Sequence, residues 1–141
     1  MAAELTLRVI TPDRIVLDTT ASSVRIPAVD GSMGILSGHA PMVAALDMGM
    51  LTFQSGGKDE AIFVSGGFVE VSDNTVRVVS EAGERPEEID EERARDAEQR
   101  ARTRIEEGRV SGVQIDILRA QFSLRRAQAR LRAGGYVRSL V

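Results

Sequence analysis

The chain has 141 residues, of which 43% are hydrophobic and 28% charged, and its formal net charge is -3. These values fit one globular domain, or a small domain with an appendage. The absence of cysteine excludes disulfides, thiolate metal sites and a cysteine nucleophile. No apolar run approaches the roughly 20 residues of a membrane span, and the first residues lack the features of a signal peptide. We therefore expect an intracellular protein.

The charged residues divide unevenly along the chain. Residues 1–86 hold 11 acidic and 6 basic residues, whereas residues 87–141 hold 10 acidic and 12 basic residues, and all of these 12 are arginines. This balance is too even for a nucleic-acid-binding protein, and no aromatic residues interleave with the arginines. We expect no nucleic-acid partner.

Residues 1–86 predict a β-domain. Segments such as 5–9 and 23–26 alternate apolar and polar residues, which is the period of a half-buried strand. About nine short strands of this kind follow one another at close spacing, and this favours an antiparallel β-sandwich or flattened barrel. We expect hairpin connections at 55–59 and 72–74, a turn at 47–49, and a break at Gly66-Gly67.

After Pro86 the apolar period changes to that of helices. The first helix is expected to begin near Asp90, because this residue and the two glutamates after it suit the positive end of a helix dipole. Its small or apolar residues fall at Ala94, Ala97, Ala101 and Ile105. We expect this helix to stop at Gly108, which opens a short glycine-containing linker.

A second helix follows the linker. Ser111 with Gln114 three residues later has the pattern of a capping box, and Gly134-Gly135 is expected to end the helix. Its apolar seam is spaced as a heptad, at Val113, Ile117, Ala120, Leu124, Ala127 and Leu131. The two helices predict an antiparallel hairpin. Because each helix alone would be marginal, the arm needs its partner helix, the β-domain or another protein to pack against.

Several blocks of the sequence together resemble the epsilon subunit of bacterial and chloroplast F-type ATP synthases, and the resemblance runs nearly end to end. The blocks are Val9-Ile10-Thr11-Pro12, Gly34-Ile35-Leu36 with His39-Ala40-Pro41, Leu46 with Gly49 and Leu51, Ser65-Gly66-Gly67-Phe68-Val69-Glu70-Val71, and Ile89-Asp90 with Arg93-Ala94. The resemblance implies a ten-stranded β-sandwich that binds the rotor, residues 1–86, and a regulatory helical hairpin, residues 87–141.

The resemblance also implies a function. Such a chain is a non-catalytic central-stalk subunit in the rotor of ATP synthase, where proton (hydrogen ion) transport drives rotation and ATP synthesis. Its helical arm inhibits ATP hydrolysis when it extends into the catalytic head. The implied partners are the gamma subunit, the c-subunit ring and the alpha/beta head. The implied location is peripheral, on the cytoplasmic face of the bacterial plasma membrane or the stromal face of the thylakoid, without insertion into the bilayer.

No catalytic residue, metal ligand or required cofactor is implied, but regulatory ATP is a candidate ligand of the folded arm. The implied nucleotide-binding residues are Ile89, Asp90, Arg93, Ala94, Arg100, Arg126 and Arg130. Guanidinium groups suit phosphate oxygens, and Arg126 and Arg130 are four residues apart on one helix face. The alternative is a structural role, in which Asp90 caps the helix and pairs with Arg93.

For the loop and strand around residues 30–41, the resemblance implies a rotor interface. Its residues are Gly31, Ser32, Met33, His39, Pro41 and Met42. The alternatives are turn geometry for the glycines and proline, loop packing for the single histidine, and core filling for the methionines. The basic second helix is either a solvated face or attracted to acidic segments of the catalytic subunits. An adaptor whose hairpin recruits a partner helix is the alternative function.

Overall fold

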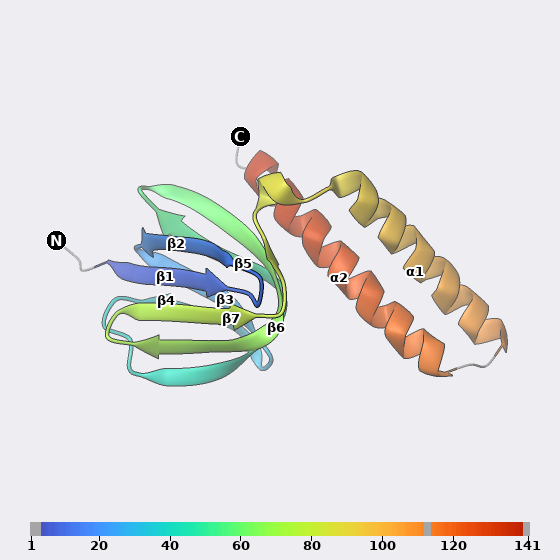
Figure 1. Cartoon of the computed structure of the whole chain (residues 1–141), viewed down its shortest axis with the longest axis horizontal. Coiled ribbons are helices and arrows are strands. Elements are labelled where there is room, and N and C mark those ends of the chain that lie inside the picture. The colour runs from blue at the N-terminus through green and yellow to red at the C-terminus, as the bar shows by residue number, and fades with distance from the viewer. Residues whose placement is uncertain (1–3, 112–113, 140–141) are drawn as a thin grey trace.

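The computed structural model describes residues 4–111 and 114–139, and it shows a β-sandwich followed by a hairpin of two long helices (Figure 1). The strands are β1 (Leu5–Ile10), β2 (Ile15–Ala21), β3 (Ser23–Ala28), β4 (Gly31–Leu36), β5 (Met42–Ser55), β6 (Lys58–Ser72), β7 (Thr75–Ser80) and β8 (Gly83–Glu84). A short 3₁₀ helix, η1 (Pro86–Glu88), leads into α1 (Glu91–Ser111) and α2 (Gln114–Ser139). The predicted fold class, a β-sandwich with a C-terminal helical hairpin, is confirmed.

The strands form one sheet that folds over on itself. Its order is β2-β1-β7-β6-β5-β3-β4, with β8 beside β6. Neighbouring strands are antiparallel except β1 and β7, which are parallel. The long strands β5 and β6 pair with each other along almost their whole length. β7 pairs with the second half of β6, and β3 pairs mainly with the second half of β5. Because β5 and β6 are antiparallel, these halves lie at opposite ends of the pair, so the two long strands connect the layer that contains β7 to the layer that contains β3.

The turn predicted at 47–49 and the break predicted at Gly66-Gly67 are both wrong, because β5 and β6 continue through these positions without interruption. The strands kink there as they pass from one layer to the other. The side that faces the interior changes at the kink, so that Leu46 and Gly49 are both buried although they are three residues apart. Alternation is therefore lost, and one long strand looks like two short ones. The described residues hold eight strands instead of the nine or ten predicted.

The kink requires a glycine at one position. Gly67 has a φ of 112°, and a Cβ built on it would lie 1.9 Å from the carbonyl oxygen of Val79. No other residue fits such a close approach of two backbones. The interior beside the kink is filled with fully buried aliphatic side chains, such as Leu7, Ile26 and Val64.

The helix ends predicted at Gly108 and at Gly134-Gly135 are also wrong, because α1 continues to Ser111 and α2 to Ser139. Gly108 and Gly134 are both buried where the helices meet. Each glycine continues a stripe of small residues spaced by seven. The stripes are Ala94, Ala101 and Gly108 on α1, and Ala120, Ala127 and Gly134 on α2. Small residues let two helices approach closely, so these glycines belong to the packing seam and do not stop the helices. The expected capping box involves side chains outside the described part of the chain.

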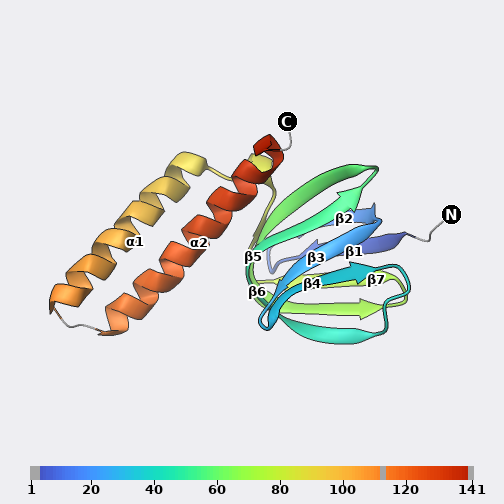
Figure 2. The ribbon, with the colours of Figure 1, turned by 180° about the vertical axis from the view of Figure 1, so that it is seen from behind.

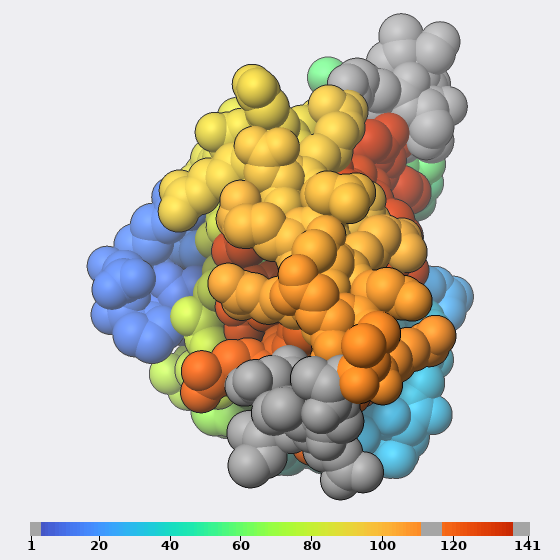
Figure 3. All heavy atoms as spheres, turned by 90° about the vertical axis from the view of Figure 1, so that its right-hand side faces the viewer, coloured from blue at the N-terminus to red at the C-terminus, as the bar shows by residue number. Residues whose placement is uncertain are grey.

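The hairpin is folded against the sandwich through α2, and α1 packs on the outer side of α2 (Figures 1 and 2). Seen from the hairpin side, α1 covers much of α2 and of the strands behind it (Figure 3). Beneath α2 lies an apolar group that we call the docking cluster. It consists of Phe63, Ile89, Ala129 and Ala133, with Met48, Met50 and Ala82 packed around them. Of the described side chains of α2, only alanines belong to this cluster.

Candidate functional site

The start of α1 is fixed by Asp90. Its Oδ1 accepts a hydrogen bond from the backbone N–H of Arg93 at 3.0 Å, and its carbonyl accepts one from the N–H of Ala94, also at 3.0 Å. This is the geometry of an N-cap, so the structural role considered for Asp90 is present. Because only Ile89 separates η1 from Asp90, the cap lies at the junction between sandwich and hairpin.

A cavity of about 350 Å³ opens beside this junction. Its walls come from β8, η1, α1 and α2, and they are formed by Glu84, Glu88, Asp90, Arg93, Ala94, Ala97, Arg100 and Arg130. Five of the seven residues proposed from the sequence for nucleotide binding therefore lie together. The other two do not line the cavity: Ile89 is 8% exposed in the docking cluster, and Arg126 is exposed on α2.

The sequence-based proposal did not include Glu84, Glu88 and Ala97. The helical spacing of Arg93, Ala97 and Arg100 could have indicated Ala97, since these residues share one face of α1. No sequence pattern indicates the two glutamates, because they precede the helix and reach the cavity only through the folding of the linker.

Some of the charged side chains that line the cavity already form ion pairs. Arg130 donates to Glu84, with Nη2 and Nε at 2.8 and 3.0 Å from its Oε1, and its guanidinium lies 4.8 Å from the centre of the Phe63 ring. Glu88 accepts a hydrogen bond from Arg14 and lies 4.0 Å from Arg85. Within residues 4–111 and 114–139, neither Arg93 nor Arg100 forms an ion pair.

This arrangement can bind an anion. Two uncommitted guanidinium groups can donate hydrogen bonds to phosphate oxygens. The Asp90 carboxylate can accept a hydrogen bond from a hydroxyl or amino group, because only one of its oxygens is used by the cap. Side chains form the contacts here, and no glycine-rich loop provides backbone N–H groups for the phosphates. In the part of the chain that the structure describes, no group of three or more potential metal ligands is present.

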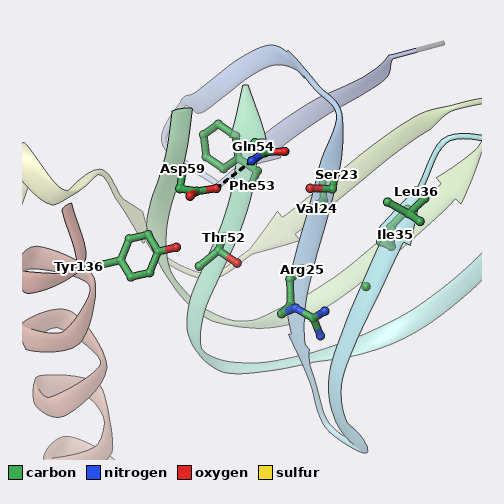
Figure 4. A pocket seen from close by; sticks show the side chains of 11 residues that line it. Ser23, Val24, Arg25, Ile35, Leu36, Thr52, Phe53, Gln54, Asp59 and Tyr136 are labelled. Carbon is green, nitrogen blue, oxygen red and sulfur yellow. Dashed lines mark hydrogen bonds between the residues drawn. The ribbon is translucent and has the colours of Figure 1, made fainter. Parts of the chain in front are cut away.

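A second cavity, of about 300 Å³, lies on the sandwich beside the C-terminal part of α2 (Figure 4). The side chain of Tyr136 projects from α2 toward Thr52 and Asp59 on the strands (Figure 4). On the strand side, Gln54 donates a hydrogen bond to Asp59 at 3.3 Å. The cavity is thus formed jointly by helix and sheet, which shows that α2 meets the sandwich beyond the docking cluster as well.

The residues proposed for the rotor interface fall into two groups. Gly31, Ser32 and Met33 begin β4, whereas His39, Pro41 and Met42 follow its other end. The second group lies in a loop that is held by a 2.8 Å hydrogen bond from the Gly38 N–H to the Asn74 side chain. Met33 and Met42 are partly buried and pack against the sandwich core.

An apolar row crosses the outer face of one layer of the sandwich. Cross-strand neighbours in register share a face of a sheet. The registers of β5, β6, β7, β1 and β2 place in one line Ala45, Phe68, Val79, Ile10 and Ile15. Phe68 is 41% exposed and Ile15 is 63% exposed. The parallel row beside it is charged and comprises Glu70, Arg77, Arg8 and Asp18. An exposed apolar row next to charged residues is typical of a protein-binding surface.

The fold and its surfaces thus define a protein in two parts, a sandwich with an exposed apolar row and a docked helical arm beside a cavity lined by arginines and carboxylates. A family model of the ATP synthase delta/epsilon chain, beta-sandwich domain, matches residues 4–86, and one of its long alpha-helix domain matches residues 87–135. The chain belongs to this family of ATP synthase subunits.

Relatives of similar length support this assignment. The chain is 48% identical over 134 residues to the ATP synthase epsilon chain of Symbiobacterium thermophilum, with 94% of each chain covered. It is 44% identical over 131 residues to that of Microcystis aeruginosa, with 93% of this chain and 95% of the relative covered. As a member of this family it is a non-catalytic subunit of ATP synthase, and the adaptor alternative is set aside.

Solved structures show the same fold. A chain in the mitochondrial ATP synthase of Euglena gracilis, an assembly of OSCP, F1 and c-ring, has a TM-score of 0.78 and 26% identity, over 92% of this chain and 80% of that chain. A chain in the central stalk and c-ring of the Tetrahymena thermophila enzyme has a TM-score of 0.51 at 18% identity, which supports the fold alone. Among the described residues, no helix is long and apolar enough to cross a membrane.

Proposed function

We propose that this chain, as a non-catalytic rotor subunit, couples proton-driven rotation to ATP synthesis and restrains ATP hydrolysis through its helical hairpin. The observation that carries the proposal is the small size of the apolar groups through which α2 docks on the sandwich. Of the described side chains of α2, those in the docking cluster are Ala129 and Ala133. A helix held by such small groups can leave the sandwich at modest cost and extend toward the alpha/beta head, where its arginines meet acidic segments.

We further propose that ATP binds in the cavity between the linker, α1 and α2. Its walls come from β8 of the sandwich, η1 of the linker and both helices of the hairpin, so the complete site requires the folded hairpin. A ligand that binds one state of an equilibrium stabilises that state. ATP would therefore favour the folded hairpin and reduce the inhibition of hydrolysis. Arg93 and Arg100 are the expected phosphate ligands, and Asp90 is the expected acceptor for the ribose or the base.

Calorimetric titration of the full chain with ATP tests this site. Replacing Arg100 with Ala removes a charged hydrogen-bond donor, and we expect roughly ten- to hundredfold weaker binding. The matched control is Arg104→Ala, because Arg104 is exposed on α1 and does not line the cavity; its affinity should equal that of the unchanged chain. No heat of binding at millimolar ATP, or equal affinity for both variants, would exclude the proposed site.

The sandwich is the proposed rotor-binding part. Its apolar row through Phe68 offers the gamma subunit an exposed surface flanked by charges. The loop that carries His39 and Pro41 is proposed to face the c-subunit ring, because the exposed side chains of Leu36 and Val43 adjoin it. This arrangement would place the chain at the membrane periphery, on the cytoplasmic face in a bacterium or the stromal face in a thylakoid.

Co-purification with gamma tests the rotor surface. Phe68→Asp puts a charge in the middle of the apolar row, and we expect the full-length variant to lose gamma from the complex. Val110→Asp is the matched control, because Val110 is an apolar residue on α1 that is 86% exposed; this variant should retain gamma. Retention of gamma by both variants would contradict the assignment of the surface.

A further inference from the structure

Among the described residues, two ion pairs join the hairpin to the sandwich, and only one of them lies in the proposed nucleotide site. Of the other pairs within the described residues, one joins Arg14 of the sandwich to Glu88 of the linker, and the rest lie inside the sheet, the linker or α1. Arg130 pairs with Glu84, and both residues line the cavity. Arg125 pairs with Asp47, and neither of these residues lines it. The second pair can therefore hold α2 whether or not a nucleotide is present.

Asp47 is held ready for this contact by the kink of β5. The ladder between β5 and β6 pairs Leu46 with Gly67 and Met48 with Ser65, and it skips Asp47 between them. Its Oδ1 accepts a 2.8 Å hydrogen bond from the N–H of Met48, which fixes the direction of the carboxylate. Nη2 of Arg125 lies 3.2 Å from both carboxylate oxygens.

The pair matters because the contacts around it are small. The side chains of Arg125 and Asp47 are 51% and 40% exposed, so solvent weakens their attraction. Nevertheless, the described residues that α2 adds to the neighbouring docking cluster are alanines, so that a modest polar interaction is significant beside these small apolar contacts. A small free-energy change shifts an equilibrium between docked and undocked states by a measurable factor.

We propose that Asp47 and Arg125 form a latch that sets the fraction of docked hairpin independently of nucleotide. Glu84 and Arg130 form a second contact that lies within reach of the nucleotide. If the two contacts are independent, their effects on docking multiply. Loss of the latch should then lower docking by the same factor with and without ATP. The regulatory meaning of the latch rests on the proposed function of the arm, but its existence does not.

Spin-label distance measurements on the full chain test the latch. The chain has no cysteine, so labels on Ser72→Cys and Thr103→Cys, both exposed positions, report the sandwich-to-α1 distance. Without nucleotide, we expect Asp47→Asn or Arg125→Gln to lower the ratio of docked to undocked molecules roughly two- to fivefold. The double variant should show no further loss. The charge reversals Asp47→Arg and Arg125→Asp should lower the ratio more, and combining them should restore docking.

The control is Arg119→Asp, which changes the net charge as Arg125→Asp does but at an exposed residue of α2 away from Asp47. It should leave the distances unchanged. Equal distances in the unchanged chain and in all Asp47 and Arg125 variants would overturn the latch, as would failure of the charge swap to restore docking. ATP calorimetry on the same variants separates the two proposals, because a chain that binds no ATP can still show the latch.

Discussion

The sandwich and the hairpin differ in the size of the groups that they bury. The sandwich interior consists mainly of leucine, isoleucine, valine and phenylalanine, and full burial of each such side chain contributes about 1.5–3 kcal/mol. The fully buried positions between the helices are alanines and glycines, which contribute far less per residue. All members of the main core lie between Leu5 and Val78. The sandwich is therefore stabilised by a core of its own, whereas the hairpin depends for its stability on the sandwich surface beneath it.

The largest expected effect concerns the kink that lets the sandwich fold over. Gly67→Ala would place a Cβ 1.9 Å from the Val79 carbonyl oxygen, and we expect a loss of more than about 4 kcal/mol in the free energy of unfolding. Gly66→Ala is the control, because Gly66 has a φ of 71° but a Cβ there would meet only the Glu81 side chain, at 3.9 Å; it should lose only about 1–2 kcal/mol. Denaturant unfolding measures both. Similar losses would mean that the two strands can separate at the kink.

Two neighbouring residues on β6 separate the regions directly. Ile62 belongs to the sandwich core, whereas the fully buried Phe63 faces α2 in the docking cluster. Ile62→Ala should lower sandwich stability by about 2–5 kcal/mol. Phe63→Ala should act mainly on docking, because the Phe63 side chain is covered by α2 and not by the core. Amide hydrogen exchange resolves the two effects. If the sandwich amides of Phe63→Ala lost protection before those of α2, the two regions would not be separate in stability.

A smaller effect is expected in the seam between the helices. Gly108→Leu inserts a large side chain into a stripe of small residues, and overpacking of this kind costs about 1–3 kcal/mol. Gly135→Ala is the control, since a Cβ there meets nothing within 4 Å and alanine favours helix by about 1 kcal/mol. Thermal melting of the helical signal should move down for the first variant and up for the second. A rise for Gly108→Leu would show that this seam is not closely packed.

The comparison also explains what could be predicted from the sequence. Alternation in β1, β3 and β7 and heptad spacing in α2 indicated the two parts correctly, because each strand keeps one face toward the core and α2 keeps one stripe toward α1. Hydrophobic periodicity did not indicate the structure where an element changes neighbours. At Leu46 and Gly49 the buried face switches within β5, and at Gly108 a residue that usually ends helices serves as the smallest member of a seam.

The residues of the candidate site were also predicted only in part. Asp90, Arg93 and Arg100 lie on one helix, so their proximity follows from sequence spacing. Arg130 reaches them from α2 because the hairpin is antiparallel, which the seam indicated. Glu84 enters through β8, and Asp47 meets Arg125 across 78 positions of sequence. Contacts of this kind depend on how the hairpin lies on the sandwich, and local patterns do not contain that information.

The central claim is that the hairpin restrains ATP hydrolysis while the sandwich alone secures assembly. Its most direct test is the rate of ATP hydrolysis by the assembled enzyme when the chain ends at Pro86, compared with the full-length chain. Because the sandwich core is complete without the hairpin, we expect the shortened chain to join the complex in equal amount and hydrolysis to rise. Normal assembly with an unchanged rate of hydrolysis would contradict the inhibitory role of the hairpin.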